Sequence, residues 1–359
     1  MSDSKAAPIS LVTGGAGFIG TNLALRLIAE GHRVLLFDDL SRPGVEANLR
    51  WLCERHPDHV EAIIADILDP YAVRSAVNRA DEVYHLAAQV AVTTSLESPL
   101  RDFDVNTRGT LNLLEALRAR RHPPPLLYAS TSKVYGALED IPLERRERRY
   151  MPLDPIVRHN GIDERRPLDF HGPYGCSKGA ADQYVLDHAR CFGLRTVVLR
   201  MSCIYGPHQC GSEDQGWVAH FMIRGLDHQP ITIFGDGRQV RDILYVDDLV
   251  SAMRAAMQNI GRLAGHAFNI GGGPSHTVSL LELLDLIGRR YGLCPPRHFR
   301  PWRRGDPLYY VTNPARFSAL TQWRPRTSVE QGIDGLYQWL CTTRPGPPVP
   351  APLARAASQ

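Results

Sequence analysis

Residues 9–38 read ISLVTGGAGFIGTNLALRLIAEGHRVLLFD, and this stretch decides the fold. An apolar run at 9–13 enters a glycine cluster, a helical pattern follows at 21–30, and a second apolar run occupies 34–37. Further apolar runs recur at 60–65, 83–86, 126–129 and 196–199, with helix-length patterns notably at 103–120 and 180–192. The alternation predicts an α/β fold with a parallel sheet covered by helices.

The composition is that of a globular chain, long enough for two domains or one elaborate domain. Of the 359 residues, 43% are apolar and 22% are charged; Lys and Arg number 41 against 38 acidic residues. Because no long basic run is present, we expect no nucleic-acid partner. No segment approaches the ~20 apolar residues needed to span a bilayer, and the start lacks a secretory apolar core. These features predict a cytoplasmic protein without membrane contact.

The cysteines give no sign of a metal site. They are seven in number, scattered, and contain neither CxxC nor a Cys/His spacing typical of metal ligands. We therefore expect reduced thiols and no bound metal.

The later part of the chain predicts a second, smaller and discontinuous domain. We expect one domain from 1–200 with parts of 235–270, and the other from 201–234 and 271–343. Between Gly136 and Tyr174 lies a polar, proline-punctuated insertion, of a kind that is usually functional or mobile. The proline-rich end, 344–359, predicts a disordered tail.

The glycine cluster predicts a dinucleotide site. Gly14, Gly17 and Gly20 lie at three-residue intervals between the first strand and the first helix. This pattern permits a tight turn, close approach of a pyrophosphate, and packing of helix on strand. Asp38, at the end of the second strand, would accept hydrogen bonds from both ribose hydroxyls and repel a 2′-phosphate. NAD is therefore favoured, although Arg33 and Arg42 leave NADP open.

Two later strand ends extend this site. Asp66 ends the third apolar run, where a side chain would overhang the adenine pocket, and the small residues after His85 would let the backbone lie against the cofactor. The positions expected to contact the cofactor are Gly14, Gly17, Phe18, Ile19, Gly20, Asp38, Asp66, Ile67, Leu86, Ala87 and Ala88, with Tyr174 and Lys178.

Three residues form a candidate catalytic set. Thr131 follows the fifth apolar run, and Tyr174 and Lys178 are spaced to share one helix face. To act as a base near pH 7, a tyrosine needs a pKa well below its usual ~10. An ammonium about 4 Å away supplies on the order of 4 kcal/mol, and an oxidised nicotinamide adds to it. Tyr174 would remove a hydroxyl proton, Lys178 would lower its pKa and bind the nicotinamide ribose, and Thr131 would orient the hydroxyl.

The motifs TGGAGFIG, HLAA, STSKVYG and PYGCSK, in this order, resemble the extended short-chain dehydrogenase/reductases that act on nucleotide sugars. The resemblance runs from about Ile9 to Leu340. It implies a doubly wound Rossmann-type domain that binds NAD, and a smaller carboxyl-terminal domain that binds a nucleotide-diphosphate sugar. It also implies a homodimer built from helices around 103–120 and 176–192.

The residue after Ser132 bears on the reaction. Family members that dehydrate or decarboxylate a sugar carry acidic residues after the catalytic Ser/Thr, whereas Lys133 stands here. Return of the hydride to the same carbon, as in an epimerase, is then the simplest chemistry. The alternatives are a UDP-hexose 4-epimerase, a 4,6-dehydratase and a noncatalytic NAD-binding regulator.

Within the family, the stretches 168–185, 202–221 and 230–248 resemble epimerases that invert carbon 2 of a CDP-linked 3,6-dideoxyhexose, so a CDP-sugar is favoured. Arg241 and Arg303 match family positions that contact the diphosphate, for which charge-assisted donors are needed. Either Arg303 or Arg304 could serve, because Arg304 replaces a more usual proline. The remaining expected substrate contacts are Ser95, Thr131, Gln215, Gly216 and Trp217.

Overall fold

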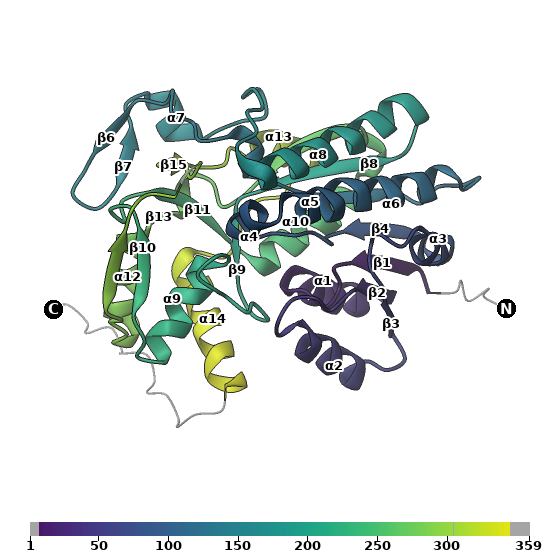
Figure 1. The fold of residues 1–359 in the computed structure, drawn as a ribbon, viewed down its shortest axis with the longest axis horizontal. Helices are drawn as coiled ribbons and strands as arrows, with labels where there is room; N and C mark the ends of the chain where they lie inside the picture. Colours follow the sequence, from purple (N-terminus) through teal and green to yellow (C-terminus); the bar gives the residue numbers. More distant parts are fainter. Residues whose placement is uncertain (1–6, 304, 345–359) are drawn as a thin grey trace.

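A computed structural model describes residues 7–303 and 305–344, and a seven-stranded sheet forms its centre. All neighbouring strands of this sheet run parallel, which confirms the predicted α/β fold (Figure 1). In spatial order the strands are β12 (His266–Ile270), β8 (Thr196–Met201), β5 (Leu126–Thr131), β4 (Glu82–His85), β1 (Ile9–Thr13), β2 (Arg33–Asp38) and β3 (Val60–Ile64). The order reverses beside β1, between β4 and β2, which is where open α/β sheets bind their ligands.

Helices cover both faces of the sheet, as in a doubly wound fold. One face packs against α3 (Pro70–Arg79), α6 (Gly109–Arg118) and α8 (Gly172–Phe192). The other packs against α1 (Phe18–Ala29), α2 (Val45–Arg55), α10 (Val246–Gln258), α11 (Ile260–Leu263) and α13 (Ala315–Thr321). The inner strands, such as β5 and β8, are buried on both faces, which explains their apolar runs, whereas the edge strand β3 is partly exposed.

The structure corrects two helices and adds a strand. The helix expected at 180–192 begins at Gly172, because Pro173 is well suited to a first helical turn. The helix expected at 103–120 is divided into α5 (Pro99–Phe103), a π-helical turn η1 (Asp104–Arg108) and α6. The seventh strand, β12, was not predicted, because its sequence HAFNI contains two polar residues and forms no apolar run.

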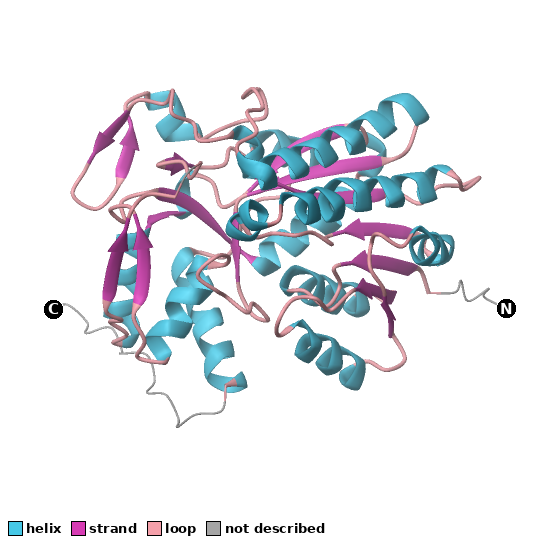
Figure 2. Cartoon of the chain, in the orientation of Figure 1, coloured by secondary structure: helices cyan, strands magenta, loops and turns pink. Residues whose placement is uncertain are grey.

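A second group of elements lies beside the carboxyl edge of the sheet, at the left of Figures 1 and 2. It contains a mixed sheet and a separate parallel strand pair. The strands are β9 (Cys203–Tyr205), β11 (Val240–Tyr245), β13 (Thr277–Ser279), β15 (Tyr309–Tyr310), β10 (Ile231–Phe234) and β14 (Arg297–Arg300). Their helices are α9 (Trp217–Leu226), η3 (Pro274–His276), α12 (Leu280–Tyr291) and α14 (Val329–Thr343).

The insertion after Gly136 is built onto this second group. It forms β6 (Leu143–Arg145), β7 (Tyr150–Pro152) and α7 (Pro155–Asn160). The Arg149 guanidinium donates to both carboxylate oxygens of Glu282 on α12. The insertion therefore ties the loop after β5 to the second group before the chain returns to α8.

The proposed domain boundaries stay a prediction. The segment 235–270 contributes to both groups, since β11 lies in the mixed sheet while α10 and β12 belong to the central layers. The predicted tail, 344–359, lies outside the described residues except for Arg344. No helix in the described part of the chain is long and apolar enough to cross a membrane.

Candidate active site

The glycine turn after β1 is closely packed. Gly14 has a φ of +69°, and a Cβ there would lie 2.7 Å from the backbone nitrogen of Ala87. A Cβ on Gly20 would lie 2.5 Å from the carbonyl oxygen of Gly14. Only glycine therefore allows this turn to lie between the end of β4 and the start of α1.

The start of α1 fits the pyrophosphate of a dinucleotide. Gly17 is its N-cap and offers no side-chain cap, and the first turn holds no acidic residue. The N–H groups of Phe18, Ile19 and Gly20 belong to the first turn, whose donors have no acceptor within the helix. Free donors and the positive end of the helix dipole together favour a bound anion.

Asp38 lies beside this turn, as expected for a ribose-binding carboxylate. Its Oδ2 accepts from the backbone N–H of Ala16 at 3.0 Å, and its Oδ1 from that of Leu40 at 2.9 Å. Burial raises the pKa of Asp38, while these two hydrogen bonds lower it. The carboxylate retains lone pairs for ribose hydroxyls.

The third and fourth strand ends lie along the same edge. Asp66 accepts from the N–H of Leu68 and pairs with Arg101 at 3.2 Å. The side chain of Ile67 is buried in the core, so only its backbone is available to a cofactor. The N–H of Leu86 donates to the carbonyl of Thr13, which holds 86–88 against the glycine turn.

Thr131, Tyr174 and Lys178 come together across β5 and α8. Thr131 lies near the hydroxyl of Tyr174, where it lowers the pKa of that phenol. The Lys178 ammonium donates to the carbonyl of Ala129 at 2.6 Å and lies 4.2 Å from the centre of the Tyr128 ring. The structure thus places the three predicted catalytic residues in one cluster.

The electrostatics of this cluster differ from the expectation. Burial raises the pKa of Tyr174 to about 12, and the groups that lower it are Thr131 and the Arg42 guanidinium, not Lys178. Burial also lowers the pKa of Lys178 to about 7, while Asp182 and Asp102 raise it. The sequence analysis expected Lys178 to lower the pKa of Tyr174 as a charged ammonium, but burial of Lys178, which is only 4% exposed, disfavours that charge.

A buried polar network supports the cluster from beneath. Asp182 is fully buried, accepts from Ser130 at 2.8 Å, and forms two hydrogen bonds of 2.9 Å with Arg200. In the π-helical turn, Asn106 donates to Ser177, one residue before Lys178. These contacts fix α8 relative to β5 and β8.

A pocket of about 430 Å³ opens above the cluster, between the central sheet and the second group. Five of the predicted substrate residues line it together with Tyr174: Gln215, Gly216, Trp217, Arg241 and Arg303. Thr131 does not line the pocket itself but lies near Tyr174, which does. The structure therefore brings distant segments of the chain into one cleft.

Ser95, also a predicted substrate residue, does not line this cleft. Its side chain is fully buried in α4 (Val92–Glu97), and its hydroxyl donates to the carbonyl of Val92 at 2.7 Å. Val92, one helical turn earlier, lines the pocket.

Both pocket arginines have acidic neighbours. Arg241 is 3.0 Å from Asp306, and Arg303 is 3.4 Å from Asp214. The Arg303 guanidinium also lies 3.9 Å from the centre of the Phe234 ring, which restricts its orientation. The planar donors of both arginines suit a diphosphate.

Sequence reasoning missed several residues that line the pocket. Lys133 and Cys203 follow the ends of the adjacent strands β5 and β8, a position that could have indicated them. Asp306 belongs to the same motif, WRRGDP, as Arg303, but only the arginines of that motif were predicted as contacts. Further lining residues that were not predicted include His171, Phe234 and Gln239.

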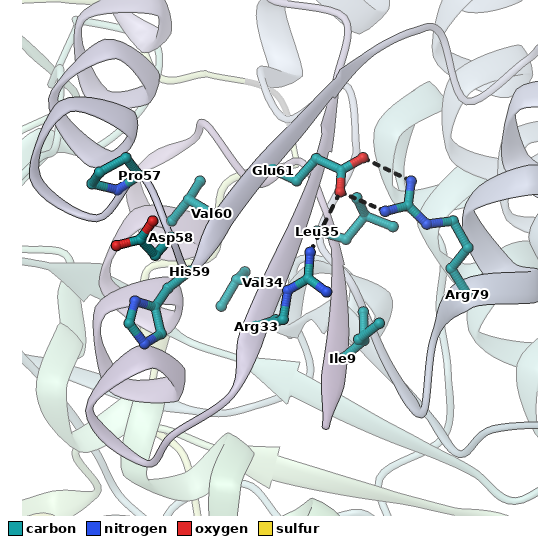
Figure 3. Close-up of a pocket in the computed structure, with 10 residues that line it drawn as sticks. All are labelled: Ile9, Arg33, Val34, Leu35, Pro57, Asp58, His59, Val60, Glu61 and Arg79. Atoms are coloured by element: carbon teal, nitrogen blue, oxygen red, sulfur yellow. Dashed lines mark hydrogen bonds and ion pairs between the residues drawn. The ribbon is translucent and has the colours of Figure 1, made fainter. Parts of the chain in front are cut away.

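A second hollow lies at the opposite, amino edge of the sheet (Figure 3). There Glu61 lies between Arg33 and Arg79, and Arg79 donates to it at 2.7 Å. The carboxylate of Glu61 is paired with these two arginines. Parallel sheets bind their ligands at the carboxyl edge, not at this amino edge.

Comparison with known proteins agrees with this geometry. Residues 10–271 match the NAD dependent epimerase/dehydratase family. The chain is 41% identical to CDP-paratose 2-epimerase from Salmonella typhi, over 92% of this chain and 98% of the relative. It is 30% identical to a putative UDP-glucose 4-epimerase from Methanocaldococcus jannaschii, over 92% and 97%.

Solved structures give the same picture. UDP-glucose 4-epimerase from Thermotoga maritima, solved with UDP-glucose, superposes with a TM-score of 0.80 at 30% identity, covering 93% of this chain and 99% of the other. UDP-glucuronic acid 4-epimerase from Bacillus cereus, solved with UDP-glucuronic acid and NAD, gives 0.80 at 27% identity, over 94% and 100%. The chain therefore belongs to the NAD-dependent epimerase/dehydratase family and is an enzyme that uses NAD.

Proposed function

We propose that this enzyme inverts carbon 2 of a CDP-linked 3,6-dideoxyhexose, converting CDP-paratose to CDP-tyvelose through a transient 2-ketone. The observation that carries the proposal is the position of Tyr174, with Thr131 near it, in a pocket lined by Arg241 and Arg303. The identity of 41% with a CDP-paratose 2-epimerase over nearly the whole chain supports the choice of sugar and base.

Each residue has a definite task in this reaction. NAD would be held by the glycine turn, Asp38 and Lys178, and it would supply the hydride acceptor and donor that oxidation and re-reduction at carbon 2 require. Tyr174 takes the hydroxyl proton and later gives it back, and Thr131 orients that hydroxyl. Lys178 binds the nicotinamide ribose, and Asp38 binds the adenosine ribose.

The nucleotide sugar is held at its phosphates. When the substrate binds, contacts of Arg241 and Arg303 with the diphosphate replace their contacts with acidic neighbours. One charge-assisted hydrogen bond thus replaces another. Gln215, Gly216 and Trp217 border the base or the sugar. An anchored diphosphate leaves the sugar free to turn its other face toward the cofactor.

A dehydratase is the second candidate, and Lys133 argues against it. Loss of water needs an extra acid and base beside the catalytic hydroxyl. The side chain at this position is an ammonium paired with Asp306 at 2.6 Å. A UDP-hexose 4-epimerase shares the same base and cofactor, so the product must distinguish it.

The decisive measurement is proton NMR in deuterated water, with NAD and a panel of CDP-paratose, UDP-glucose and UDP-galactose. We expect the carbon 2 epimer of CDP-paratose without deuterium at the inverted carbon. A 4-keto-6-deoxy product carrying deuterium would mean dehydration and would overturn the proposal. Inversion of only the UDP-sugars would identify a 4-epimerase.

We further propose a cytoplasmic homodimer. The seven cysteines are all free thiols, which suits a reducing compartment. Leu100 and Phe103 on α5 and Tyr184 and Phe192 on α8 expose large apolar side chains on the two helices expected at the interface. Light scattering that gives the mass of one chain would refute the dimer.

A further inference from the structure

Lys133 connects the catalytic hydroxyl to the far wall of the pocket. It lies in the short 3₁₀ turn η2 (Ser132–Tyr135), and its N–H donates to Thr131 Oγ1 at 3.2 Å. Its side chain extends into the pocket, where Nζ lies 2.6 Å from Asp306 Oδ1. The base of this side chain is thus fixed to the catalytic cluster and its tip to the opposite wall.

The same carboxylate oxygen also binds Arg241. Asp306 Oδ1 accepts from Arg241 Nη2 at 3.0 Å, so one negative charge serves two cations. The two cations hold the pKa of Asp306 well below its usual range despite burial, and the carboxylate stays charged. Lys133, Arg241 and Asp306 together therefore carry a net charge of +1 on the pocket wall.

Lys133 has hydrogen-bond donors to spare. An ammonium has three N–H donors. Across residues 7–303 and 305–344, Asp306 is the one acceptor that the structure gives its Nζ. The side chain is 29% exposed and lines the pocket, so the remaining donors are open to a bound anion.

We propose that Lys133 binds the phosphate bonded to the sugar and thereby places carbon 2, rather than carbon 4, at Tyr174. This inference rests on the proposed function. Lys133 lies between the cation expected to bind the diphosphate, Arg241, and the catalytic Thr131. It therefore extends the phosphate site toward the reacting hydroxyl.

The chemistry of the sugar explains why this matters. The phosphate is attached at carbon 1, whose neighbour is carbon 2, whereas carbon 4 lies two carbons farther around the ring. A 3,6-dideoxyhexose keeps hydroxyl groups at both carbon 2 and carbon 4, so either could in principle be oxidised. A phosphate held close to Thr131 and Tyr174 brings carbon 2 to the base. A phosphate held only by the arginines would leave room for carbon 4.

The competing explanation is a structural ion pair that merely joins η2 to the loop at 305–306. Lys133→Met tests phosphate binding against this structural role, because it removes the charge of Lys133 while Arg241 continues to pair with Asp306. Lys133→Arg keeps the charge. Arg165→Met is the matched control, because it removes a paired cation that is 91% exposed and remote from the pocket.

The first test measures binding of CMP and CDP to the NAD-loaded enzyme by calorimetry. The terminal phosphate of CDP stands for the phosphate bonded to the sugar. We expect Lys133→Met to weaken the affinity for CDP by about 10-fold or more, which corresponds to the loss of one charge-assisted hydrogen bond. The affinity for CMP should stay unchanged. Lys133→Arg and Arg165→Met should bind CDP within about 3-fold of wild type. Equal CDP affinity for Lys133→Met and wild type would overturn the proposal.

The second test measures turnover of CDP-paratose, with proton NMR to identify the product. We expect Lys133→Met to raise KM, to lower kcat/KM for inversion at carbon 2 by about 10-fold or more, and to form some carbon 4 epimer. Undiminished inversion at carbon 2 would overturn the placement of the sugar. The two arms also separate the proposals: if wild type does not turn over CDP-paratose but Lys133→Met weakens CDP, the phosphate contact stands and the proposed function fails.

Discussion

Removing the candidate catalytic lysine should make the protein more stable. Lys178 is 4% exposed, and burial lowers its pKa from 10.5 to about 7. Each unit of pKa corresponds to about 1.4 kcal/mol. Keeping Lys178 in this site therefore costs the folded state on the order of 4 kcal/mol near neutral pH.

Lys178→Met removes that cost but also loses a contact. The ammonium donates to the carbonyl of Ala129, and an unpaired buried carbonyl costs roughly 1–3 kcal/mol. The expected net effect is a gain in the free energy of unfolding of roughly 2 kcal/mol near pH 7. Turnover should fall sharply at the same time.

The pH dependence identifies the cause. Because the pKa of Lys178 is lower in the folded state, the unfolded chain binds more protons between about pH 7 and about pH 10.5, and wild-type stability rises across this range. Lys178→Met lacks this rise. Its advantage is therefore largest at and below about pH 7, and it is lost as the pH approaches about 10.5.

Urea unfolding without added NAD, at about pH 6, 7.5 and 9.5, measures this difference. Arg165→Met controls for loss of a surface cation and should stay within about 0.5 kcal/mol of wild type. A variant that is no more stable than wild type near pH 7, or an advantage that does not change with pH, would refute the reasoning.

Further substitutions test the rest of the site. Tyr174→Phe should retain NAD but lose at least about 10²-fold in turnover, and full activity would remove this residue from the mechanism. Asp38→Ala should weaken NAD binding by about 10-fold or more in a fluorescence titration, and an unchanged affinity would contradict the role of Asp38. Gly20→Ala places a Cβ 2.5 Å from a backbone oxygen, so thermal melts should show a lower Tm and titrations weaker NAD binding. Asp182→Asn leaves Arg200 buried beside a neutral partner and should cost roughly 3–5 kcal/mol in urea unfolding; a loss under about 1 kcal/mol would refute this.

The parts of the fold that follow from local pattern were predicted well. Six strands of the central sheet were predicted from apolar runs. In the inner strands both faces are buried, whereas the edge strand β3 keeps a mostly apolar sequence although it is partly exposed. β12 was not predicted because polar residues, His266 and Asn269, interrupt its apolar sequence. Asn269 is buried through hydrogen bonds that only the folded chain supplies. A polar residue that is satisfied by distant partners leaves no signal in a local window.

The candidate site divides in the same way. The glycine turn, Asp38, Thr131 and Tyr174 are recognisable because each follows a strand or opens a helix, and parallel strands bring these ends to one edge. The pairing of Lys133 with Asp306 joins residues far apart in the chain, and no spacing rule could have found it. Ser95 was predicted as a contact, yet it lies one helical turn from the pocket-lining position.

The raised pKa of Tyr174 has a consequence for the order of events. At a pKa of about 12, only about one molecule in 10⁵ carries an ionised tyrosine at pH 7. Burial thus keeps this residue protonated until further positive charge arrives beside it. An oxidised nicotinamide carries such a charge and a reduced one does not. The added charge lowers the pKa of Tyr174, so we expect the ionised form that can accept the hydroxyl proton to be populated mainly while the nicotinamide is oxidised. After hydride transfer the pKa rises again, and Tyr174 holds the proton that returns to the ketone oxygen.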